Sequence, residues 1–146
     1  MLADWIDSRF QDKFVEDHDL IVMGDFNVPK IGDKLFQALT SKGLQIPDSV
    51  VDLKAGDQVI KGSNLLKNAR YDQILHLPTL KKRFTNSGGT LDFFGSEARI
   101  KELFPGKDYT VTQFSFQLSD HFPVWVQLDI NIEGERLNQI IQDGKK

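Results

Sequence analysis

Three short polar clusters border apolar runs in this sequence, and their residue types are those of hydrolytic sites. Asp25 and Asn27 come directly after one short apolar run. Asp72 opens a second run, and the adjacent residues Asp120 and His121 enter a third. Together the clusters supply three carboxylates, one amide and one imidazole. That inventory fits hydrolysis of a phosphate ester better than acyl transfer or hydride transfer.

The donor atoms of these clusters favour a hard cation. The chain contains no cysteine, so disulfides, thiolate zinc sites and cysteine nucleophiles are excluded. Oxygen ligands are those that Mg²⁺ prefers, with Mn²⁺ as the alternative. A carboxylate on a neighbouring strand can also hold an imidazole in one tautomer and stabilise its charged form. We therefore expect a site that combines a magnesium ion with a carboxylate–imidazole pair.

Each cluster also has a purely structural explanation. Asp25 after a glycine is typical of a turn or a helix cap, and Asp72 alone would be a surface charge. His121 could simply hydrogen-bond a loop. Ser119 lies two residues before His121, but no Gly-x-Ser-x-Gly sequence surrounds it, so a serine nucleophile is not expected.

Charge gives only a modest indication of the substrate. The chain has 18 basic and 21 acidic residues, a net charge of −3, which excludes a globally basic nucleic-acid binder. Lys61, Lys67 and Arg70 flank the Asp72 run and favour a polyanionic substrate. The basic run at 81–83 is more simply interpreted as a solvated charge run.

Helical and extended patterns alternate along the chain and must position these clusters. Apolar residues at helical spacing predict three helices, over 2–16, from 35 to near Gly43, and over 97–104. Apolar runs predict strands over 20–23, 71–77 and 122–130, and a hairpin within 84–94 that turns at Asn86–Gly89. Segment 45–68 is interpreted as a loop with at most one short strand. This order predicts an α/β fold whose active site lies in loops beyond the strand ends.

Length and composition predict one packed domain. The 146 residues are 40% apolar, and we assign 1–130 to the domain and 131–146 to a tail with a short helix and a frayed end. No apolar run approaches the roughly 20 residues needed to span a bilayer, and the first residues do not form a secretory signal. The lack of cysteine suits a reducing compartment such as the cytoplasm; the sequence leaves the localisation otherwise open.

In their order along the chain and in their residues, the three clusters resemble the last three motifs of the endonuclease/exonuclease/phosphatase superfamily. The strings are Ile-Val-Met-Gly-Asp-Phe-Asn, Tyr-Asp-Gln-Ile-Leu and Leu-Ser-Asp-His-Phe-Pro-Val. The resemblance implies that Asp25 and Asn27 handle the attacking water and the scissile phosphate, and that Asp120 belongs to the metal site. It further implies that His121 stabilises the pentacovalent transition state, with Asp72 as its orienting partner. Whether Asp25 or His121 is the general base stays open.

The resemblance also implies that this chain is the C-terminal half of a four-layer α/β sandwich. The family's first half supplies an asparagine, the principal metal-binding glutamate and a further histidine, and nothing before Asp25 matches them. We therefore expect one mixed β-sheet with helices on one face, Mg²⁺ binding that is weak or absent, and a chain that is inactive or nearly inactive alone. An apolar sheet face without its N-terminal half is expected to drive homo-oligomerisation.

Three functional hypotheses follow. The first is a metal-dependent phosphodiester or phosphomonoester hydrolase, with DNA as one possible substrate. The second keeps the chemistry but places it in an inositol-phosphate or phospholipid phosphatase, because loops rather than the fold select the substrate. The third is a truncated interaction module without catalysis. The five site residues that resemble the family's motifs are all present, which argues against the third hypothesis.

Overall fold

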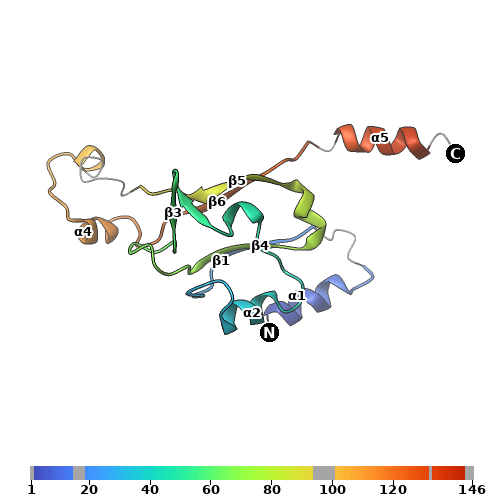
Figure 1. Cartoon of the computed structure of the whole chain (residues 1–146), viewed down its shortest axis with the longest axis horizontal. Helices are drawn as coiled ribbons and strands as arrows, with labels where there is room; N and C mark the ends of the chain where they lie inside the picture. The colour runs from blue at the N-terminus through green and yellow to red at the C-terminus, as the bar shows by residue number, and fades with distance from the viewer. Residues whose placement is uncertain (1, 15–18, 94–100, 132, 144–146) are drawn as a thin grey trace.

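Helices and strands alternate along the chain in a computed structural model that describes residues 2–14, 19–93, 101–131 and 133–143. The described helices are α1 (Leu2–Phe10), α2 (Lys34–Thr40), α4 (Val111–Ser115) and α5 (Glu133–Asp143), with 3-10 turns η1 (Asp48–Val50) and η2 (Pro78–Arg83). The strands are β1 (Ile21–Asp25), β2 (Leu53–Ala55), β3 (Gln58–Ile60), β4 (Asp72–His76), β5 (Phe84–Thr90) and β6 (Val124–Leu128). The predicted α/β class is confirmed (Figure 1).

Strands β1 and β4 form an antiparallel pair that carries two of the predicted clusters. The register places Asp25 opposite Asp72 and Val22 opposite Leu75. Helices α1 and α2 cover one face of this pair (Figure 1), where Ile6 and Phe36 pack with Leu75 in a buried apolar cluster. Alternation along each strand therefore turns Leu75 toward the helices while its neighbours face the opposite side.

The remaining four strands form the predicted mixed sheet, in the order β3-β2-β5-β6. The β1–β4 pair is separate from it, so the strands do not form the single sheet that was expected. Strand β2 runs parallel to β5, and the other neighbours are antiparallel. Turn η1 lies between this sheet and the β1–β4 pair (Figure 1), and Val50 packs there with Leu53 and Ile60. Segment 45–68, interpreted as a loop with at most one strand, thus contains η1, β2 and β3.

The predicted hairpin within 84–94 is wrong, because residues 84–90 are a single strand, β5, and residue 94 lies outside the described residues. Gly88 and Gly89 are not at a turn but in the strand. A Cβ at Gly88 would lie 2.7 Å from Ser49 Oγ, and one at Gly89 would lie 2.7 Å from the Lys54 carbonyl oxygen. The glycines are therefore needed because η1 and β2 approach the strand closely.

Local side-chain hydrogen bonds mark the end of α1 and the start of α2. The first helix, predicted over 2–16, ends at Phe10, and the Asp12 carboxylate then accepts a hydrogen bond from the Phe14 amide in an Asx turn. At α2, the Asp33 side chain caps the N-terminus by accepting from the Phe36 amide at 2.8 Å. Half of the helix predicted over 97–104 lies outside the described residues, and in the described half residues 101–103 are helical.

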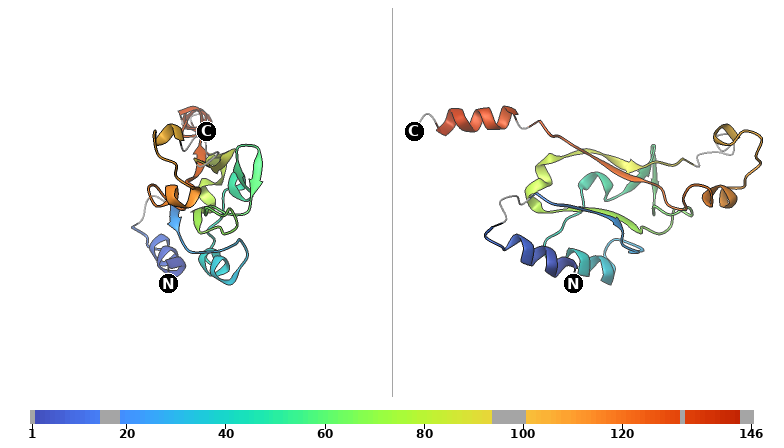
Figure 2. Two further views of the ribbon diagram at one scale, coloured as in Figure 1. Left: turned by 90° about the vertical axis from the view of Figure 1, so that its left-hand side faces the viewer. Right: turned by 180° about the vertical axis from the view of Figure 1, so that it is seen from behind.

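The two ends of the molecule differ in how they are packed. Near α4, a third buried cluster joins Phe114 and Phe122. At the opposite end, α5 extends away from the sheets (Figures 1 and 2), and its side chains Leu137 and Ile140 are exposed. This is the helix predicted in the tail. Among the described residues, no helix is both long enough and apolar enough to cross a membrane.

Candidate active site

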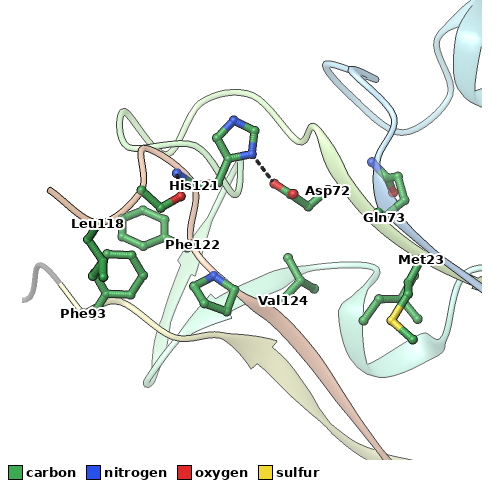
Figure 3. A pocket seen from close by; sticks show the side chains of 12 residues that line it. Met23, Asp72, Gln73, Phe93, Leu118, His121, Phe122 and Val124 are labelled. Carbon is green, nitrogen blue, oxygen red and sulfur yellow. Dashed lines mark hydrogen bonds and ion pairs between the residues drawn. The ribbon is translucent and has the colours of Figure 1, made fainter. Parts of the chain in front are cut away.

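Asp72 and His121 are hydrogen-bonded although 49 residues separate them in the sequence. Nδ1 of His121 lies 2.9 Å from Oδ2 of Asp72 (Figure 3), and the two side chains are 25% and 23% exposed. An ionised carboxylate only accepts hydrogen bonds, so the imidazole donates through Nδ1. In the neutral ring this leaves Nε2 as a proton acceptor. The arrangement is that of an imidazole poised for proton transfer and oriented by a carboxylate.

The backbone around His121 is held by segment 63–65 from another part of the fold. The Phe122 amide donates to the Ser63 carbonyl at 2.6 Å, and the Leu65 amide donates to the Asp120 carbonyl at 2.7 Å. These bonds pair the two segments in an antiparallel bridge centred on His121. The ring of Tyr71 stacks against the imidazole at 5.7 Å between centroids. The histidine therefore occupies a fixed place without belonging to a strand.

Ser63 is a site residue that the sequence analysis missed. Its hydroxyl donates to Oδ2 of Asp72 at 2.5 Å, the same oxygen that His121 contacts. The side chain is completely buried. A serine in a loop rich in glycine and asparagine is typical of a turn, so its sequence context gives no indication of this contact.

Asp25 ends β1 and Asn27 follows it, at the strand end that lies beside Asp72. Because Asp25 lies opposite Asp72 in the β1–β4 register, the two side chains project to the same face of the pair. Both Asp25 and Asn27 are exposed, and the Asp25 carboxylate accepts from the Asn27 amide at 2.9 Å. Asn27 has φ of 52°, a conformation that asparagine tolerates better than most residues. The tight turn therefore presents both side chains to solvent beside Asp72.

Asp120 lies next to His121 but its side chain is exposed. Within the described part of the chain, no three acidic or histidine side chains come close enough together to hold a metal ion. Mg²⁺ is commonly bound through one or two carboxylates, with water completing the shell. A magnesium site at Asp120 therefore stays a prediction.

Two cavities meet at His121. The first, about 600 Å³, has a largely apolar wall that includes Met23, Ile74 and Leu118, and it reaches Asp72 and His121 (Figure 3). The second, about 660 Å³, also reaches His121. It is lined by residues that include Tyr71, Phe116, Asp120 and His121. Ser119, shared by both cavities, accepts a hydrogen bond from the His121 amide at 3.0 Å. The Ser119 hydroxyl thus forms a local turn.

Two of the basic residues expected near a polyanionic substrate form contacts within the protein itself. Lys67 forms a 2.6 Å ion pair with Asp92. Arg70 is buried and its guanidinium donates to the carbonyls of Val50 and Val51. Burial lowers the pKa of Arg70 to about 10, opposed by the nearby charge of Asp52, so the side chain remains charged at neutral pH. Burial therefore keeps Arg70 from contacting a polyanion, and the expectation for Lys67 stays a prediction.

Comparison of the chain with known protein families, with curated proteins and with solved structures finds no match. The functional conclusion therefore depends on the site itself and on the resemblance of its three motifs.

Proposed function

We propose that this chain carries part of the active site of a metal-dependent phosphoester hydrolase of the endonuclease/exonuclease/phosphatase type. The observation that supports the proposal most strongly is the 2.9 Å hydrogen bond between His121 and Asp72 beside two cavities. Asp25 and Asn27, which the motif resemblance assigns to the attacking water and the scissile phosphate, lie at the same strand edge. Four of the five candidate residues thus lie at one edge of the fold, and Asp120 adjoins His121.

In this proposal, each side chain acts through the contacts already described. Asp72 holds the imidazole of His121 with Nδ1 protonated and stabilises the ring when it gains a second proton at Nε2. Nε2 is then the atom that exchanges a proton with the reacting water or hydrogen-bonds a phosphoryl oxygen. Asp25 or His121 accepts the proton of the attacking water, and the Asn27 amide binds the phosphate. When bound, magnesium would neutralise phosphate charge and orient a phosphoryl oxygen.

A phosphodiester is the substrate class that the two cavities favour. His121 lines both of them, so a phosphate held at Nε2 would have space on either side. A diester carries two ester groups and can place one in each cavity, whereas a monoester would fill only one. DNA and phospholipids both satisfy this requirement, and inositol phosphates fill one cavity.

The single acidic ligand proposed for the metal predicts a slow enzyme. With Asp120 as the protein ligand, Mg²⁺ binding would be weak, and the activity of the chain alone would be low and would not saturate at moderate Mg²⁺ concentrations. That the chain is one half of a larger sandwich stays a prediction. A second half supplying further acidic ligands would raise both Mg²⁺ affinity and rate.

Hydrolysis of bis-p-nitrophenyl phosphate and of p-nitrophenyl phosphate, measured against Mg²⁺ concentration, tests this function. We expect slow, Mg²⁺-dependent release that favours the diester and falls by about 10²-fold or more in His121→Ala and Asp72→Asn. Asp57→Asn, at the exposed turn between β2 and β3, is the matched control and should retain the wild-type rate. Equal rates in the wild type and His121→Ala would refute the hydrolase and favour an interaction module.

We also propose that an exposed face of the mixed sheet binds a second copy of the chain. Val59 of β3 and Trp125 of β6 are 61% and 41% exposed, although both side chains are large and apolar. Exposed apolar patches commonly mark interfaces. Sedimentation at micromolar concentration should show a dimer that Trp125→Lys dissociates, and a wild-type monomer under these conditions would contradict the proposal.

A further inference from the structure

We propose that Ser63 is a positioning residue that fixes the Asp72 carboxylate for His121, so that the functional unit is a chain of three side chains rather than a pair. The catalytic role of these three side chains depends on the proposed hydrolase function. Its geometry can be tested without measuring catalysis.

The contacts of Ser63 converge on one oxygen atom of Asp72. Oδ2 accepts the Ser63 hydroxyl at 2.5 Å and faces Nδ1 of His121 at 2.9 Å. The Asp72 amide donates back to the Ser63 hydroxyl oxygen at 3.2 Å. One carboxylate oxygen has two lone pairs, so both donors can be satisfied at once. With the hydroxyl on one lone pair, the other is directed toward the imidazole.

Ser63 is itself held on both sides by the backbone. Its amide donates to the Ala69 carbonyl at 3.0 Å, and its carbonyl accepts from the Phe122 amide at 2.6 Å. The Asn64 side-chain oxygen accepts from the amides of Asn68 and Ala69 at 2.9 and 2.8 Å, which closes the loop 62–69. Because Ser63 is fully buried, its hydroxyl has no solvent to exchange with, and it donates to Asp72 alone.

The Ser63 hydroxyl restrains the Asp72 carboxylate, whose side chain could otherwise rotate. Asp72 is the first residue of β4, its side chain is 23% exposed, and Asp25 opposite adds a second negative charge. Like charges directly across an antiparallel pair repel one another. A hydroxyl donor on Oδ2 reduces that repulsion and keeps the carboxylate turned toward His121. Without the hydroxyl, we expect the carboxylate to sample other rotamers and the Nδ1 proton to lose its acceptor for part of the time.

Imidazole NMR of the full chain tests this inference. Long-range ¹H–¹⁵N spectra of the wild type should show His121 as a single Nδ1–H tautomer with a slowly exchanging proton. In Ser63→Ala, we expect that proton to exchange with water about 10- to 100-fold faster, as for the loss of a hydrogen bond to a charged group, and the other tautomer to appear. Ser63→Thr retains the hydroxyl and should restore the wild-type spectrum.

Controls separate positioning from folding and from catalysis. Ser115→Ala removes a hydroxyl from the wall of the second cavity, where it bonds only the Thr112 carbonyl, and should leave the His121 signals unchanged. If Ser63→Ala does not fold, the wild type still decides, because the buried Ser63 hydroxyl proton should give a nuclear Overhauser contact to Nδ1–H of His121. Absence of that contact, or identical His121 spectra in wild type and Ser63→Ala, would overturn the proposal. An inactive protein that shows these signals would refute only the hydrolase.

Discussion

Gly62 is the position where one added methyl group should damage both the fold and the site. A Cβ built on Gly62 lies 2.3 Å from the backbone nitrogen and from the carbonyl oxygen of Ala69. Real Cβ contacts are more than about 1 Å longer, and backbone atoms cannot rotate aside as a side chain can. In Gly62→Ala, the two sides of the loop, at Gly62 and at Ala69, must therefore move apart.

The hydrogen bonds that cross the loop give the size of the effect. Four backbone bonds join its two sides, and three of them lie nearest to Gly62: Lys61 to Lys67 at 3.2 Å, and Ser63 and Asn64 to Ala69 at 3.0 and 3.3 Å. Each contributes about 1 kcal/mol to the free energy of unfolding. Loss of all three predicts that Gly62→Ala lowers this free energy by about 3 kcal/mol, which corresponds to a fall of roughly 6–12 °C in Tm for a domain of this size.

Urea denaturation followed by circular dichroism measures this change, with His121 NMR recorded on the same sample. The matched control is Gly134→Ala, since a Cβ there meets nothing within 4 Å and the residue lies in α5. This control should be neutral or slightly stabilising. If Gly62→Ala unfolds within about 0.5 kcal/mol of the wild type and keeps the Asp72–His121 signals, the close approach at Ala69 does not constrain the loop.

Three further substitutions test other parts of the structure. Arg70→Met leaves the Val50 and Val51 carbonyls without their guanidinium donor and should lower the free energy of unfolding by about 2 kcal/mol in the same urea assay. Gly88→Val places a Cβ within 2.9 Å of a Val50 methyl and should cost about 1–3 kcal/mol; an unchanged midpoint would contradict close packing of η1 on β5. Asp120→Asn should abolish the Mg²⁺ stimulation of diester hydrolysis while leaving the metal-free rate unchanged, and equal Mg²⁺ titrations would remove Asp120 from the metal site.

Strands β1, β4 and β6 were predictable because their apolar runs are strong local signals. Each ends or begins within a few residues of the predicted boundary, and the clusters at Asp25 and Asp72 consequently lie side by side. The contact between Asp72 and His121 was predicted through the motif resemblance, because nothing local brings together residues 49 positions apart. Patterned segments and motif order thus predicted the main elements of the site.

What the sequence did not reveal depends on contacts between distant segments. Gly88-Gly89 has the composition of a turn, and only the approach of η1 and β2 explains why it stays extended. Ser63 resembles any loop serine until the fold places Asp72 beside it. Arg70 resembles a substrate-binding cation, but its guanidinium donates to the backbone carbonyls of Val50 and Val51 at the end of η1. In each case the partner lies in another element, and no local pattern shows that the fold brings the two together.

The Asp72–His121 bond joins two sheets that share no strand. Asp72 begins β4 of the antiparallel pair, and His121 leads into β6 of the mixed sheet. A small sliding of one sheet against the other would break this bond while leaving every strand intact. Regions with few cross-links open at lower free energy than cores do. Gentle heating or dilute denaturant should therefore abolish the proposed chemistry before the secondary structure melts, which makes the histidine a sensitive reporter of how the two layers are aligned.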